Sequence, residues 1–180
     1  RYNVVTGVQT CALPISGWQL MAPVLLPGQL DRDALLVPRG SAGLQPLDGA
    51  RWAEPLRDAV PRLLRQDLAQ ALGAPLWAVP LPPGVRPARQ LRLEILALDV
   101  AADRRSVLLQ ARWSLADPTG ASPPQLGEAS FSTPANGVNV DPENVDAAAA
   151  DGGTSAVANA LAMAHRRALW QLAQRIAATP

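Results

Sequence analysis

The sequence lacks lysine and has one cysteine, one histidine, one phenylalanine and one tyrosine among its 180 residues. A single cysteine excludes an internal disulfide framework and a zinc cluster built from cysteines. The cationic residues are all arginine and nearly balance the acids, for a net charge of +1. Because these charges are scattered and stacking aromatic rings are few, we expect no nucleic-acid partner.

Long hydrophobic runs are missing too. Proline, arginine or aspartate interrupts every apolar segment well short of the roughly 20 residues that cross a bilayer. The length fits one domain with a real core. We therefore expect a single domain without a membrane-spanning segment in the sequence as it stands.

The start of the chain is anomalous, because polar residues stand where a secreted protein has a cationic and then an apolar stretch. Residues 5–15 resemble the one-frame translation of a sequencing-adapter oligonucleotide. We expect residues 1–16 to be such an artefact and to be disordered, and residues 17–180 to form the domain. Cys11 follows Val-Gln-Thr and no apolar run, so we do not assign it as a lipidation site. Any lipid anchor would then be missing from this chain.

Short apolar runs separated by turn residues predict three strands near the start. The first run, Leu20–Leu26, ends at Pro-Gly, and Ala34–Pro38 and Leu44–Leu47 follow. Three short strands within thirty residues indicate the edge of a sheet.

From Trp52 to Leu72 the apolar residues recur at helical spacing, and Gly73 is a suitable C-terminal cap. Pro61 lies inside this pattern. An internal proline removes one hydrogen bond and clashes with the preceding turn, at a cost of about 3 kcal/mol. We expect a kink or a restart of the helix near Val60.

The longest strand pattern covers Arg89–Val100, and a turn at 101–104 leads to a partner that alternates from Val107 to Leu115. A loop at 117–124 separates this β-hairpin from a further alternating strand at 128–133. The simplest topology is an antiparallel meander.

A final helix is predicted after a loop at 136–153. Thr154 or Ser155 can cap it, and apolar residues then recur every three or four positions up to Ile176. Together the patterns predict an α/β fold: a single-domain sandwich with a mixed, mostly antiparallel sheet packed against two long amphipathic helices.

No catalytic constellation is visible. His165 lies inside the final helix, where we expect a surface or boundary position, and no serine occupies a Gly-x-Ser-x-Gly elbow. No glycine-rich phosphate loop is present. Glu94 and Asp99 on the long strand are explained by solvated or edge positions. We predict no catalytic residue, no metal site and no cofactor.

One junction stands out, where Arg51, Trp52, Glu54 and Pro55 open the first helix. In the structural interpretation, the indole packs into the core while Glu54 and Pro55 suit the positive end of a helix. In the functional interpretation, this junction presents a surface to a partner protein.

The hexapeptide Arg-Trp-Ala-Glu-Pro-Leu at 51–56 resembles the ABC-type transport auxiliary lipoproteins, the PqiC-like family. The resemblance covers about 160 residues in the same order. It includes the segment 26–32 before the hexapeptide, the strand 91–99, its partner 109–115 and the closing helix 157–176. Two departures are Leu98, where the family often has an aromatic residue, and Pro61 within the first helix.

The resemblance implies a non-catalytic periplasmic lipoprotein, anchored at the outer membrane, that docks with an MCE-family protein of a lipid transport system and self-associates into a homo-oligomer. An alternative is another envelope lipoprotein that binds lipid or protein outside lipid transport. A small hydrolase, in which His165 would meet a serine and a carboxylate, is the third. The lipid carried, the oligomer size and the surface that meets the partner stay open.

Overall fold

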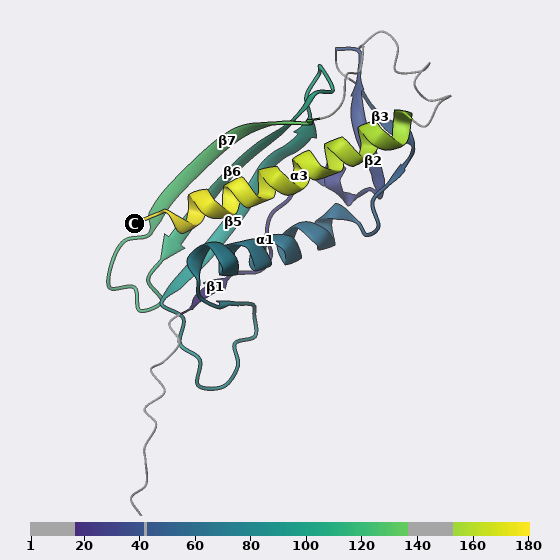
Figure 1. Cartoon of the computed structure of the whole chain (residues 1–180). Coiled ribbons are helices and arrows are strands. Elements are labelled where there is room, and N and C mark those ends of the chain that lie inside the picture. The colour runs from purple at the N-terminus through teal and green to yellow at the C-terminus, as the bar shows by residue number, and fades with distance from the viewer. Residues whose placement is uncertain (1–16, 42, 137–152) are drawn as a thin grey trace, which may run out of the picture.

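The computed structural model describes residues 17–41, 43–136 and 153–180. The expected disorder of residues 1–16 and most of the expected loop at 136–153 lie outside these described residues. A five-stranded sheet carries two helices on one face, and a separate β-hairpin stands beside one end of the sheet (Figure 1). The predicted α/β sandwich is therefore confirmed.

The sheet is mixed. Its first two contacts are parallel, β4 with β1 and β1 with β5, whereas β5, β6 and β7 pair antiparallel. The order across the sheet is β4 (Leu76–Trp77), β1 (Trp18–Leu20), β5 (Arg89–Val100), β6 (Ser106–Ala116) and β7 (Gln125–Pro134).

The predicted meander is confirmed, and its alternation positions the core. Along β6, the residues at odd positions from Val107 to Leu115 are buried, whereas Gln110 and Arg112 are exposed. Residues directly opposite each other share a face, so the side chains paired with Arg112, namely Glu94 and Glu128, lie on the uncovered face. One face of the sheet thus belongs to the core and the other is open.

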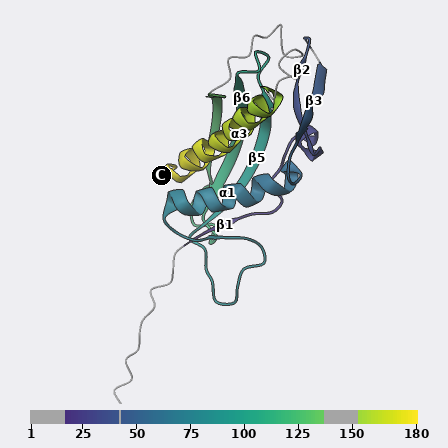
Figure 2. The same ribbon diagram turned by 45° about the vertical axis from the view of Figure 1, so that its right-hand side comes forward.

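The two helices α1 (Leu56–Leu72) and α3 (Gly153–Ala177) lie side by side on the same face of the sheet (Figures 1 and 2). Each buries the apolar stripe that its spacing predicts. In α1 the stripe is centred on Val60, Leu64 and Leu68. In α3 it consists of Val157, Leu161, Ala164, Ala168, Leu169, Leu172 and Ile176.

Two expectations about the first helix, its start at Trp52 and a restart near Val60, are wrong. The helix begins at Leu56 and not at Trp52, because Pro55 takes the N-cap position in an extended conformation. Pro61 does not interrupt it either, and α1 continues to the left-handed cap at Gly73. The carbonyl that loses its partner belongs to Arg57, an exposed residue, so water can hydrogen-bond to it.

The expected strand Leu20–Leu26 is also wrong. Strand β1 ends at Leu20, and beyond it only Leu25 makes an isolated bridge to Glu94 on β5. Pro23 and Pro27 have no N–H to donate and shorten the strand. Moreover, β1 is not an edge, since it lies between β4 and β5.

The next two predicted strands exist but do not join the main sheet. Strands β2 (Ala34–Arg39) and β3 (Gly43–Arg51) form a two-stranded hairpin of their own, preceded by a 3-10 turn at Gly28–Asp31. The hairpin approaches α3 and β5. Within the described ranges, no helix is both long and apolar enough to cross a membrane.

Candidate functional site

The junction between β3 and α1 is fastened to the start of β2. The backbone N–H of Trp52 donates to the Asp33 carbonyl at 2.7 Å, and the Arg51 guanidinium lies 3.6 Å from the Asp33 carboxylate. Arg51 itself is exposed. The hydrogen bond to Asp33 therefore holds the Trp52 backbone at the end of β3, while the Arg51 side chain stays at the surface.

The Trp52 side chain turns inward against α3. Its ring centroid lies 5.1 Å from that of His165 in an edge-to-face arrangement. His165 is 5% exposed, so the expected surface or boundary position is wrong. The Trp52 indole covers the His165 ring on α3. The two residues are 113 positions apart in the sequence, so helical spacing does not reveal this contact.

Burial governs the charge of His165. It lowers the pKa of the imidazole below its usual value, although a backbone hydrogen bond and the Asp99 carboxylate act in the opposite direction. The hydrogen bond runs from Nδ1 to the Leu161 carbonyl oxygen at 2.8 Å, which assigns the proton to Nδ1, because a carbonyl can only accept. The side chain thus contributes a neutral ring to the packing of Trp52.

Glu54 and Pro55 support the first turn of α1. One carboxylate oxygen of Glu54 accepts hydrogen bonds from Nη2 and Nε of Arg62, at 3.0 and 3.3 Å. The Pro55 carbonyl accepts from the N–H groups of Asp58 and Ala59. These contacts fit the structural interpretation of both residues, and a role in partner binding stays a prediction for all four junction residues.

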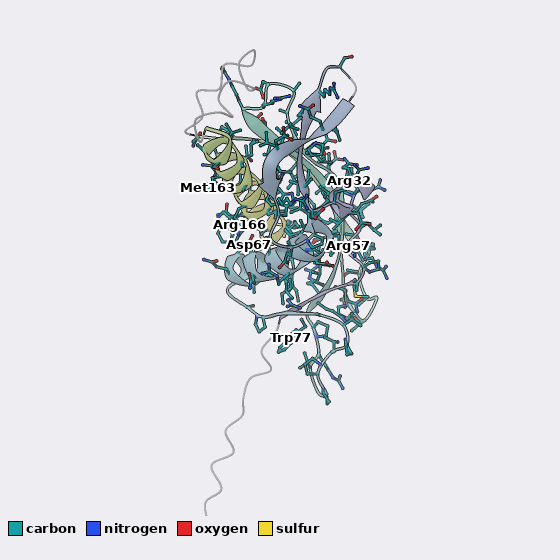
Figure 3. The ribbon with its side chains drawn as sticks, turned by 90° about the vertical axis from the view of Figure 1, so that its right-hand side faces the viewer. Arg32, Arg57, Asp67, Trp77, Met163 and Arg166 are labelled. Carbon is teal, nitrogen blue, oxygen red and sulfur yellow. The ribbon has the colours of Figure 1, made fainter. Side chains whose placement is uncertain are left out.

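A charged strip continues from the junction over the outer surface. Arg57 on α1 reaches Asp31 of the 3-10 turn at 2.7 Å, and both side chains are more than half exposed. Figure 3 shows Arg32 and Arg57 on the same side of the molecule. Exposed ion pairs of this kind add little stability, about 0–1 kcal/mol.

A groove of about 470 Å³ lies between the hairpin and the first half of α3. Arg51 and Trp52 line one wall, and small or polar side chains of α3 line the other, among them Ser155, Asn159 and Ala162. The sequence singled out only the first wall. The contribution of α3 follows from tertiary packing, and no local pattern marks it.

A larger groove of about 710 Å³ crosses the open face of the sheet. Arg112 donates from Nε to Glu94 at 2.5 Å on its floor, and Leu25 and Leu126 lie at its sides. Glu94 is thus a paired, half-buried residue and not a fully solvated one. Asp99, farther along β5, accepts a hydrogen bond from the Gln29 amide at 3.1 Å.

The described residues do not assemble a recognisable catalytic group. His165 contacts a backbone carbonyl and an indole, and no hydroxyl hydrogen-bonds to it within this part of the chain. No group of three or more potential metal ligands occurs among the residues with described positions. The arrangement consists of two grooves and a charged strip.

The domain is thus a helix-backed sheet with one groove beside the hairpin and another on the open face. Residues 14–177 match the family model described as the ABC-type transport auxiliary lipoprotein component, and the chain belongs to this family. It is thus an auxiliary lipoprotein component of ABC-type transport. Lipoproteins of this kind are membrane-anchored proteins of the cell envelope.

Solved structures share the fold. Protein XCC0632 from Xanthomonas campestris is 16% identical with a TM-score of 0.55, over 91% of this chain and 85% of that one. The hypothetical protein CT253 from Chlamydia trachomatis is 12% identical with a TM-score of 0.51, over 90% and 96%. At such identities the likeness concerns the fold alone. None of the curated proteins compared with the chain matches it.

Proposed function

We propose that this domain is a non-catalytic periplasmic subunit of an MCE-type intermembrane lipid transport system. In this proposal, a lipid anchor holds the protein at the outer membrane, and the domain docks with the MCE protein. The observation that carries the proposal is the match to the transport auxiliary family over residues 14–177. Self-association into a homo-oligomer is part of the same proposal.

In this proposal, the end of the domain near Gly17 faces the membrane and the hairpin end binds the partner protein. The first described residue, Gly17, lies at the end of the sheet away from the β2–β3 hairpin (Figure 1). An anchor that precedes Gly17 would leave the hairpin end, with the groove beside Arg51 and Trp52, pointing away from the membrane. We assign docking of the MCE protein to that groove.

A photo-crosslinking experiment on the intact gene product tests this assignment. A crosslinking amino acid replaces Asn159 in the groove, and in a control variant it replaces Leu126 on the open face. Both positions are exposed. We expect an MCE protein to be crosslinked from position 159 and not from position 126, and Arg51→Glu to reduce its co-purification.

The opposite results are equally informative. No crosslink to an MCE protein from either position contradicts the proposal. Crosslinks only to an envelope protein outside transport support the alternative of a different envelope lipoprotein. A crosslink from position 126 alone moves docking to the open face and overturns the assignment to the groove. A monomer in analytical ultracentrifugation contradicts the homo-oligomer.

A further inference from the structure

The loop between β4 and β5, residues 78–88, is attached to Gly17 and Trp18, the first two residues that the structure describes. At one side of the loop, the Trp18 N–H donates to the Pro75 carbonyl at 3.1 Å, and at the other the Ala88 N–H donates to the Gly17 carbonyl at 2.8 Å. A Cβ atom on Gly17 would lie 2.3 Å from the Pro75 oxygen, so only glycine fits. The loop projects from the domain at this end (Figures 1 and 2).

The composition of this loop is unusual for a solvent-exposed segment. It contains four prolines and three aliphatic residues, and Val79 is 52% exposed. Its only charged residue is Arg86, and residues 68–93 as a whole contain three arginines and no acid. Because proline limits backbone freedom, the loop loses little entropy when it contacts another surface.

Two half-buried tryptophans stand at the base of the loop. Trp18 on β1 and Trp77 on β4 belong to adjacent, paired strands, and Figure 3 shows Trp77 at this end of the molecule. Indole rings favour the boundary between water and hydrocarbon. Within the loop, Arg86 supplies the only charge and is exposed.

We propose that loop 78–88 rests on the surface of an anionic phospholipid bilayer, with Val79 and its aliphatic neighbours in the interface and Arg86 among the headgroups. The exposed Val79 and the half-buried Leu81 and Val85 supply apolar contact, and a cation near an anionic surface adds electrostatic attraction. This inference rests on the proposed anchor, which would reach the domain through Gly17 and so hold the loop beside the membrane. The contact would orient the hairpin end away from the bilayer.

A unique cysteine just before the domain allows a direct test. A variant with Cys11 replaced by serine and Ser16 by cysteine is coupled to a maleimide lipid in vesicles of phosphatidylethanolamine and phosphatidylglycerol, which tethers the domain near the surface without any transport protein. A tryptophan then replaces Val79, or in the control Leu44, which is 50% exposed on the hairpin. Lipids brominated in their acyl chains quench indoles that enter the bilayer.

We expect brominated lipid to quench the fluorescence of the Val79→Trp variant more than that of the parent protein. The Leu44→Trp variant should be quenched no more than the parent. Without the tether, Arg86→Gln should weaken binding to the same vesicles about fivefold. Equal quenching at both positions, or none at position 79, overturns the proposal. Circular dichroism verifies that both variants fold. Since no MCE protein is present, this outcome is independent of the crosslinking from position 159.

Discussion

An ion pair between the two helices allows a quantitative prediction. Asp67 on α1 is 1% exposed, and both of its carboxylate oxygens accept hydrogen bonds from the Arg166 guanidinium on α3. The Arg166 side chain is 45% exposed. The two residues lie next to each other in Figure 3. The pair therefore joins a buried anion to a cation that remains partly in water.

The perturbation is Arg166→Met, which keeps a long apolar side chain and removes the charge. It leaves the Asp67 carboxylate buried without the cation. Breaking a buried pair in this way costs about 3–5 kcal/mol. Because water screens the exposed half of Arg166, we expect a smaller loss, about 2–3 kcal/mol of unfolding free energy.

Urea unfolding followed by circular dichroism measures the effect. The double variant Asp67→Leu/Arg166→Met removes the stranded carboxylate and should lie within about 1 kcal/mol of the parent. As a control, Arg62→Met breaks an ion pair with Glu54 in which both side chains are more than 40% exposed, and should cost about 0–1 kcal/mol. If Arg166→Met costs no more than this control, or if the double variant is the least stable of the three, the reasoning is refuted.

Two further changes test the packing around α3. Burial lowers the pKa of His165 against the opposing influence of Asp99, so the imidazole binds a proton more readily in the unfolded chain than in the folded one. The free energy of unfolding should therefore fall as the pH drops below about 6.5, by at most about 1.4 kcal/mol per pH unit. Urea titrations at several pH values should show a weaker dependence of this free energy on pH for His165→Gln. An unchanged slope would contradict this. Gly127→Ala would place a Cβ atom 2.3 Å from the Trp113 indole, which must then move, so we expect a loss of about 1–3 kcal/mol by the same assay; a neutral substitution would show that the indole has room.

Local periodicity accounts for most of what could be predicted. The alternation from Val107 to Leu115 and the helical spacing from Val157 to Ile176 correctly identify the buried faces, because a strand or helix repeats its own geometry from residue to residue. The start of the first helix was predicted four residues too early. There, the extended conformation of Pro55 overrides a stripe that continues back to Trp52.

The candidate site was only half visible. Arg51, Trp52, Glu54 and Pro55 could be singled out as an unusual junction before the first helix, and inward packing of the Trp52 indole was one of its two interpretations. His165 was misplaced because its burial depends on the Trp52 ring, which the fold brings to it from a distant hairpin.

The sequence by itself determined the class of fold, the order of its long elements and the buried face of each, since hydrophobic spacing acts within one element. Only the tertiary structure decided that β1 pairs in parallel inside the sheet and that the hairpin stands apart from it. It also decided that the end of the loop 78–88 hydrogen-bonds to Gly17. These arrangements depend on backbone hydrogen bonds between segments tens of residues apart, and such pairings leave no periodic trace in either partner.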